Sequence, residues 1–178
     1  TARLMGRITL NPIPHIDPIG TILVPIVLMI MPTNFIIGWA KPVPVNPYNF
    51  YNYKECTLKV SSAGILTNFA FATFLALVVR FIHLAGMDGS AIGLSVAGLL
   101  AAGASINIVL GLFNLIPIPP LDGSRIVSVF LPQELSEQYD RVGQFGIIIL
   151  FLFIGIFFPV LIGIGNIFYR FIFMGMPA

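Results

Sequence analysis

The residue best placed to do chemistry is Asp122. It follows directly after a cluster of prolines, Pro117, Pro119 and Pro120, that interrupts an apolar stretch typical of a helix. Each proline lacks an N–H and clashes with the preceding turn, so the helix ends there and backbone carbonyls are freed. An ionisable group at the edge of an apolar segment is costly and is a candidate for function. The alternative is a plain turn, since Asp-Gly is a common turn pair.

A second candidate pair lies near the start of the chain. His15 and Asp17 share a short turn bounded by Pro14 and Pro18. Both residue types bind metal ions, but side chains this close in sequence point in different directions unless the loop is shaped for them. We therefore expect either a secondary polar site or a turn whose side chains satisfy its own backbone.

The composition indicates an integral membrane protein. Of the 178 residues, 57% are hydrophobic and 9% are charged, whereas soluble domains carry about a quarter charged residues. The mean hydropathy is +0.98. We expect no nucleic-acid partner, because the net charge is only +2 and no basic cluster occurs. The single cysteine, Cys56, excludes internal disulfides and zinc sites built from several cysteines.

Four apolar segments predict an all-α, polytopic bundle of transmembrane helices that forms a single membrane domain over 1–178. A helix needs roughly 20 residues to cross a bilayer, and each segment reaches about that length. Pro25 and Pro32 interrupt the first segment, which is therefore either kinked or re-entrant. A run of small residues at 98–105 lets neighbouring helices approach closely, which predicts that the third segment is central in the bundle. The segments are 19–40, 61–84, 91–115 and 146–173.

The connecting stretches set the expected orientation. Lysines and arginines gather in the proline-rich loop 41–60 and in 116–144, and none lies in the short turn 87–90. By the positive-inside rule the two longer stretches face the cytoplasm and the turn faces outside. Asp122 then lies near the cytoplasmic end of its helix. We expect a multi-pass protein of a bacterial or archaeal cell membrane.

Beyond the proline cluster the sequence becomes polar. Residues 124–130 predict a short amphipathic helix, and 132–144 is the most polar stretch of the chain. Its acidic residues, Glu134, Glu137 and Asp140, favour a solvated face over a catalytic role, because charged side chains are normally exposed.

The sequence also resembles a known family. The stretch Asn114-Leu-Ile-Pro-Ile-Pro-Pro-Leu-Asp-Gly123 is similar to the Asn-x-x-Pro…Asp-Gly signature of site-2 proteases, the intramembrane zinc metalloproteases. Other segments resemble, in the same order, parts of short bacterial members that have no PDZ domain. Together they cover most of residues 6–130, with matching segments at 6–12, 15–20, 38–47 and 63–68.

Two departures from the family pattern affect what the resemblance implies. Ile65 stands where members usually have proline, which is a mild change. The serious departure is that no His-Glu-x-x-His motif occurs in the chain; in the family its histidines bind zinc and its glutamate is the general base. The family has this motif just upstream of the segment where this chain begins. Because the first residue is Thr1 rather than methionine, we expect a chain truncated at its N-terminus.

The resemblance implies a zinc-dependent intramembrane endopeptidase that hydrolyses peptide bonds of transmembrane protein substrates in the lipid bilayer. It implies Zn²⁺ in the complete protein, with Asp122 as the third zinc ligand beside two upstream histidines. Asn114 would stabilise the substrate backbone or the tetrahedral intermediate, with a hydrogen bond between helices as its alternative. The chain as given is expected to be inactive and to bind zinc poorly, because a zinc site needs three or four protein ligands.

Two other classes of function stay open. An ion- or proton-coupled transporter or channel could use a carboxylate such as Asp122 at a broken helix to bind a cation or proton. A non-catalytic scaffold with the same fold is the other. A His-Glu-x-x-His helix in the complete protein would favour the protease over both.

Overall fold

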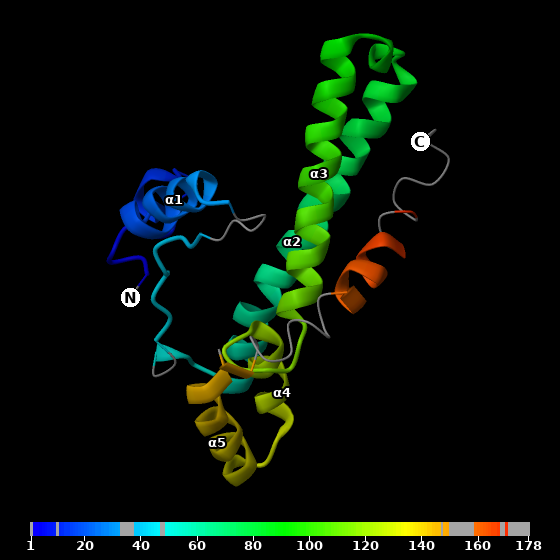
Figure 1. Ribbon diagram of the computed structural model, residues 1–178. Helices are drawn as coiled ribbons and strands as arrows, with labels where there is room; N and C mark the ends of the chain where they lie inside the picture. The colour runs from blue at the N-terminus through cyan, green and yellow to red at the C-terminus, as the bar shows by residue number, and fades with distance from the viewer. Residues whose placement is uncertain are drawn as a thin grey trace. The chain divides into compact units, whose positions relative to one another are not determined.

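A computed structural model of the chain shows helices as its only regular elements within the residues it describes (Figure 1). The prediction of an all-α protein is therefore confirmed for these residues. They divide into two compact units, Thr1–Tyr51 and Asn52–Ala178, and the single domain predicted over 1–178 stays a prediction. The described residues are 2–9, 11–32, 38–46, 49–146, 148–149, 159–167 and 170.

Two long antiparallel helices form the core of the second unit. Helix α2 spans Tyr53–Leu84 and α3 spans Ala91–Asn114, and they pack side by side along their length (Figure 1). The short 3-10 helix η4, Met87–Gly89, joins them. The described core of this pair contains Leu75, Ala76, Val79 and Ala104.

Small residues allow α3 to approach α2 closely. Ala104 is fully buried, and a Cβ atom added at Gly111 would lie 3.0 Å from the ring of Phe69. A Cβ at Gly103 would lie 3.2 Å from the side chain of Leu75. Gly103 and Ala104 of the predicted run thus let the backbones of α3 and α2 come close together, and a central place of this helix in a larger bundle stays a prediction.

Both helices are long and apolar enough to cross a membrane. The most apolar 18-residue stretch of α2 has a mean hydropathy of 2.0, and that of α3 has a mean hydropathy of 2.1. Only 33% of this stretch in α2 and 22% in α3 is buried. The core helix of a soluble protein would bury most of such a stretch, whereas here large apolar side chains such as Phe74 and Leu99 face outward. The two helices correspond to two of the four predicted segments.

The start of α2 differs from the prediction. Residues 53–60 were expected to belong to a loop, and this expectation is wrong because α2 begins at Tyr53. The Asn52 side chain caps the helix by accepting a hydrogen bond from the Glu55 N–H at 3.2 Å, and Lys59 pairs with Glu55 one turn later at 2.6 Å. Capping and i,i+4 pairing extend the helix into a polar sequence.

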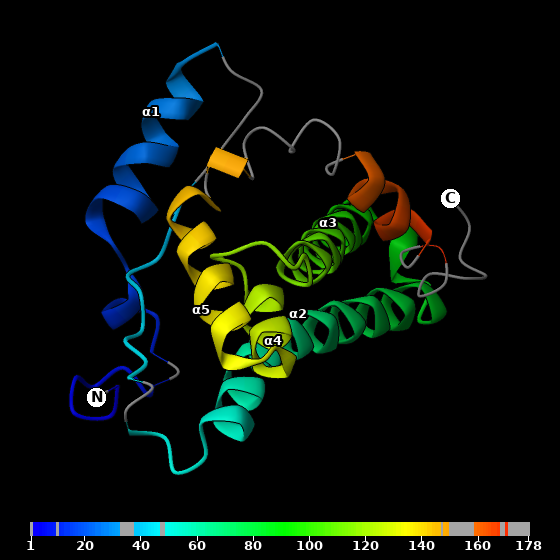
Figure 2. The same cartoon turned by 90° about the horizontal axis from the view of Figure 1, so that it is seen from below.

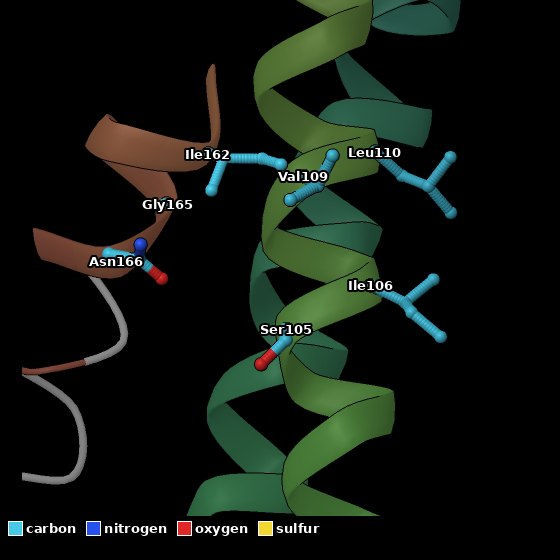
Figure 3. Close-up of a pocket in the computed structure, with 7 residues that line it drawn as sticks. All are labelled: Ser105, Ile106, Val109, Leu110, Ile162, Gly165 and Asn166. Carbon is cyan, nitrogen blue, oxygen red and sulfur yellow. The ribbon is translucent and has the colours of Figure 1, made fainter. Parts of the chain in front are cut away.

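The fourth predicted segment, 146–173, lies mostly outside the described residues. Its described part includes helical residues 159–167. These lie beside α3, and the two helices enclose a groove of about 380 Å³ lined by Ser105, Ile106, Val109, Leu110, Ile162, Gly165 and Asn166. Figure 3 shows Val109 and Ile162 facing each other across it.

The first unit contains a short interrupted helix. A π-helical stretch, η2 (Pro18–Leu23), continues into α1 (Val24–Ile30), and a 3-10 turn, η1 (Ile13–His15), precedes them. The six and seven residues of η2 and α1 reach roughly 20 Å at 1.5 Å per residue. A bilayer core is about 30 Å thick, so this helix is too short to cross it.

The two ends of the segment predicted at 19–40 lie together within this unit. The Trp39 N–H donates to the Gly20 carbonyl at 3.1 Å, and the Lys41 N–H donates to the His15 carbonyl at 2.9 Å. The Thr21 hydroxyl donates to the Trp39 carbonyl at 2.8 Å. A straight span would separate its ends by the full length of the helix. The ends of the segment therefore lie close together, and its kinked or re-entrant course in a membrane stays a prediction.

Candidate functional site

Asp122 lies at the start of a short helix directly after the proline cluster. Helix α3 ends at Asn114, and α4 spans Asp122–Phe130. The amphipathic helix predicted at 124–130 is confirmed and begins two residues earlier. Asp122 thus belongs to the first turn of a helix rather than to a plain turn, and the N-terminal end of a helix favours a negative charge.

Gly123 explains why an Asp-Gly pair occurs at this point. A Cβ atom added at Gly123 would lie 2.3 Å from the carbonyl oxygen of Leu115 and 2.7 Å from that of Ile116. Only glycine permits the start of α4 to approach the end of α3 so closely. This close approach places Asp122 beside the last turn of α3.

The carboxylate of Asp122 also lies close to α2. A Cβ atom added at Gly64 would lie 3.3 Å from Asp122 Oδ2, and α4 packs against α2 (Figure 2). Gly64 is exposed apart from this neighbour. The absence of a side chain at position 64 therefore leaves an open space next to the carboxylate, in which an ion or a substrate group could bind.

Electrostatics favour a cation at this carboxylate. Asp122 is partly buried, and this burial raises its pKa above the ordinary value, although the nearby positive charge of Arg125 lowers the pKa in part. The ion pairs of the described residues do not include Asp122. A partly desolvated carboxylate without an ion-pair partner gains by binding a metal ion, and carboxylate oxygen is a regular ligand of Zn²⁺.

The chain's own described residues do not complete a zinc site. They contain no group of three or more His, Cys, Asp and Glu side chains that could hold a metal ion. A carboxylate such as Asp122 can supply a single oxygen ligand, and its role as a zinc ligand stays a prediction. Asn114, the last residue of α3, is partly buried on the other side of the proline loop, and its role stays a prediction.

His15 and Asp17 belong to the first unit. Asp17 Oδ1 accepts hydrogen bonds from the N–H groups of Ile19 at 2.9 Å and Gly20 at 2.8 Å, so Asp17 caps the helix that follows. His15 Nε2 lies 3.4 Å from the Thr9 carbonyl oxygen. The alternative of a turn that satisfies its own backbone holds for Asp17, and a polar site formed by this pair stays a prediction.

Sequence reasoning missed a third element at the site. In helix α5, Gln133–Val142, the charged residues predicted to form a solvated face, Glu134, Glu137, Asp140 and Arg141, are exposed, and that prediction is confirmed. The prediction did not include Tyr139, whose hydroxyl donates to the Pro117 carbonyl at 2.5 Å. The following turn, η5 (Gly143–Phe145), and Gly146 lie against Pro119. The available signal was one tyrosine among charged residues, followed by two glycines, which predicts a partly buried face and a close backbone approach.

The groove between α3 and residues 159–167 has no comparable chemistry. Its lining contains no titratable side chain, and the Ser105 hydroxyl already donates to the Ala101 carbonyl at 3.0 Å. It is an apolar groove with two polar residues, Ser105 and Asn166. We therefore place the candidate functional site at Asp122.

The chain is similar to three sets of known proteins. YwhC of Bacillus subtilis (strain 168), named as a proposed zinc metalloprotease, is 39% identical over 158 residues, which cover 86% of this chain and 68% of YwhC. Rip3 of Mycobacterium tuberculosis, with the same kind of name, is 44% identical over 78 residues, which are 43% of this chain and 18% of Rip3. A further protein with this kind of name, from Thermotoga maritima, is 32% identical over 129 residues, which are 66% of this chain and 26% of the Thermotoga protein. No solved structure matches the chain.

A family model agrees with these relatives. The model of peptidase family M50 matches residues 80–155. This range contains all of α3, the proline cluster, Asp122 and helices α4 and α5. The chain belongs to peptidase family M50, the site-2 protease family that its motifs resemble.

Proposed function

We propose that the complete protein is a zinc-dependent intramembrane endopeptidase that hydrolyses peptide bonds of transmembrane protein substrates. The observation that carries this proposal is the setting of Asp122. Its carboxylate is partly buried and has open space beside it at Gly64. It follows the proline cluster at the end of α3, which is one of two helices long enough to cross a membrane. It also lies within the residues matched by the family model.

The position of the site suits hydrolysis in a membrane. Helix α3 has 24 residues, so its two ends are roughly 36 Å apart at 1.5 Å per residue. Asp122 follows one end and the 87–90 turn precedes the other. A site at the end of a membrane-spanning helix can receive water while it remains close to the apolar segment of a substrate. We propose that this end faces the cytoplasm, as the distribution of lysine and arginine predicts.

The proposed roles of the chain's own residues are limited to two. Asp122 supplies one carboxylate oxygen to the zinc ion, whose remaining protein ligands are the histidines of an upstream His-Glu-x-x-His helix. Bound zinc would acidify a water molecule. Asn114 orients the substrate, because its amide can donate to a peptide carbonyl and accept from a peptide N–H.

The experiment compares two acidic residues in the complete protein. Asp122→Ala should abolish both stoichiometric zinc binding and cleavage of a transmembrane substrate, while membrane insertion stays intact. Glu134→Ala is the matched control, because Glu134 is an exposed carboxylate in the first turn of the neighbouring helix α5; it should retain both properties. Metal analysis and a cleavage assay provide the two measurements. Wild-type zinc content and cleavage in Asp122→Ala would disprove the assignment.

A further inference from the structure

We infer that α5 and the turn after it form a brace that positions Asp122, with Tyr139 as a positioning residue. The brace consists of residues 133–146, and the proline loop consists of residues 115–121. This inference rests on the proposed function, because it assigns the brace a role in presenting a zinc ligand.

The proline loop has few backbone donors. Three of its residues are prolines and have no N–H to donate. Within the loop, the Ile118 N–H donates to the Ile116 carbonyl and the Leu121 N–H donates to the Ile118 carbonyl. The N–H groups of Leu115 and Ile116 bond back to the last turn of α3. The prolines have no such bond to donate, so contacts from other elements add to what holds the middle of the loop.

Tyr139 supplies the first outside contact. Its hydroxyl donates to the Pro117 carbonyl at 2.5 Å, across 22 residues of sequence. Partial burial raises the pKa of Tyr139, and the nearby charge of Asp140 raises it further, so the hydroxyl keeps its proton and remains a donor. Glu134, Glu137 and Asp140 are exposed on the same helix. Tyr139 is thus a polar group of α5 that faces the loop.

Two glycines supply the second outside contact. A Cβ atom added at Gly146 would lie 1.7 Å from the carbonyl oxygen of Pro119, and one added at Gly143 would lie 3.0 Å from the Pro119 side chain. Gly146 and Pro119 are both buried. The backbone after α5 therefore lies directly against the middle of the proline loop, and no side chain fits between them.

Two different elements lie against this part of the chain: the brace contacts the proline loop, and α2 lies near the carboxylate of Asp122. Asp122 follows Pro119 by three positions, and its Oδ2 lies near Gly64 of α2. A shift of the loop would move the carboxylate relative to the other zinc ligands. Metal ligands tolerate only small deviations in distance, and groups that orient a ligand change metal affinity by about 10- to 100-fold when removed.

The test uses the complete protein with Co²⁺ in place of zinc, because the visible spectrum of Co²⁺ reports the geometry of its ligands. Tyr139→Phe removes only the hydroxyl. It should shift the Co²⁺ absorption bands and weaken zinc binding, by less than the about 10- to 100-fold that follows the loss of a direct hydrogen bond to a metal ligand. It should also lower kcat by a larger factor than it changes KM. Gly146→Ala should have a larger effect on all three, because the added methyl collides with the Pro119 carbonyl.

Tyr53→Phe is the matched control, because Tyr53 is an exposed tyrosine at the start of α2; its spectrum, affinity and kcat should equal those of the wild type. Thermal melting of each variant establishes that it is folded. Wild-type values of all three quantities in Tyr139→Phe would overturn the brace, provided that Asp122→Ala loses zinc. If Asp122→Ala retains zinc and cleavage, the proposed function itself fails and the brace fails with it.

Discussion

The two ends of α3 are built in different ways. At its N-terminal end, the turn from α2 consists of residues that are close in sequence. Gly86 has a left-handed backbone with a φ of 67°, the Ser90 side chain caps α3, and His83 Nδ1 lies 2.5 Å from Asp88 Oδ2. Each of these contacts joins residues no more than five positions apart. This turn is therefore self-contained.

At its C-terminal end, α3 leads into a loop that distant residues hold in place. Tyr139 bonds to Pro117, Gly146 lies against Pro119, and the carboxylate beyond the loop lies near Gly64. The contacts come from α2, which precedes α3, and from α5 and the turn after it. The comparison shows that the structural turn is encoded locally, whereas the candidate site depends on three separate parts of the chain.

The acidic residues at these two ends differ in the same way. Asp88 is near His83, and a hydrogen bond from that ring lowers the pKa of the Asp88 carboxyl below the ordinary value of 3.8. Partial burial raises the pKa of Asp122. The charged form is stabilised in the turn and destabilised at the site. A cation bound beside such a carboxylate would favour its charged form.

The largest effect that would test this comparison comes from filling the space over Gly64. Gly64→Leu in the complete protein should eliminate stoichiometric zinc binding and cleavage, because the side chain would occupy the space next to Asp122 Oδ2. Gly64→Ala should weaken zinc binding about tenfold, since a Cβ at 3.3 Å requires only a small shift of the carboxylate. Metal analysis and chelator competition measure both effects.

The matched control is Gly98→Leu in α3. A Cβ atom added at Gly98 meets nothing within 4 Å, so the leucine should leave zinc content and cleavage unchanged. Normal zinc binding in Gly64→Leu would mean that the carboxylate does not depend on α2, and the contrast between the two ends of α3 would then be much weaker.

The sequence predicted the local features of this fold well. The apolar pattern predicted a helix at 91–115, and the prolines predicted its end, because both signals act within a few residues; α3 ends at Asn114. The first turns of α2 were missed, although Asn52 at the cap position and a Glu55–Lys59 pair were available as signals. The polar composition of this stretch outweighed them.

The sequence could identify Asp122 as a candidate but could not show what holds it. The hydrogen bond from Tyr139 to Pro117 spans 22 residues, and no local pattern indicates which distant carbonyl a tyrosine will contact. Gly64 was noticed only through resemblance to a family. Its position beside the Asp122 carboxylate follows from the packing of α2 against α4. Long-range packing therefore accounts for the parts of the site that sequence reasoning missed.

A smaller effect should follow from changing the backbone of the self-contained turn. Gly86→Ala places a Cβ on a left-handed residue and should lower the free energy of unfolding by about 1 kcal/mol. Zinc affinity should not change, because the turn and Asp122 lie at opposite ends of α3. Gly89→Ala, where a Cβ meets nothing within 4 Å, should change stability by less than about 0.5 kcal/mol. Chemical denaturation in detergent provides the measurement, and weakened zinc binding in Gly86→Ala would contradict the independence of the two ends.

The smallest expected effects have opposite signs at the two acidic residues. The folded-state pKa of Asp88 is lowered, so its charge contributes stability above the ordinary pKa of 3.8, and this contribution is lost as the pH falls through the lowered value. Asp88→Asn should therefore destabilise the protein slightly at neutral pH, and the difference should vanish in acid. The pKa of Asp122 is raised, so its charge costs stability above that raised value, and the cost disappears as the pH falls towards 3.8.

Asp122→Asn should accordingly stabilise the metal-free protein slightly at neutral pH, and the gain should shrink in acid. The measurement is the denaturation midpoint of the metal-free wild type and of the two variants between neutral pH and about pH 3, in the same detergent. Metal must be absent, because bound zinc would stabilise the charged form of Asp122 and reverse the sign of its effect. If both substitutions changed stability in the same direction, burial at Asp122 would not be the dominant influence on its charge. The space over Gly64 would then be a hydrated surface rather than a partly desolvated cation site.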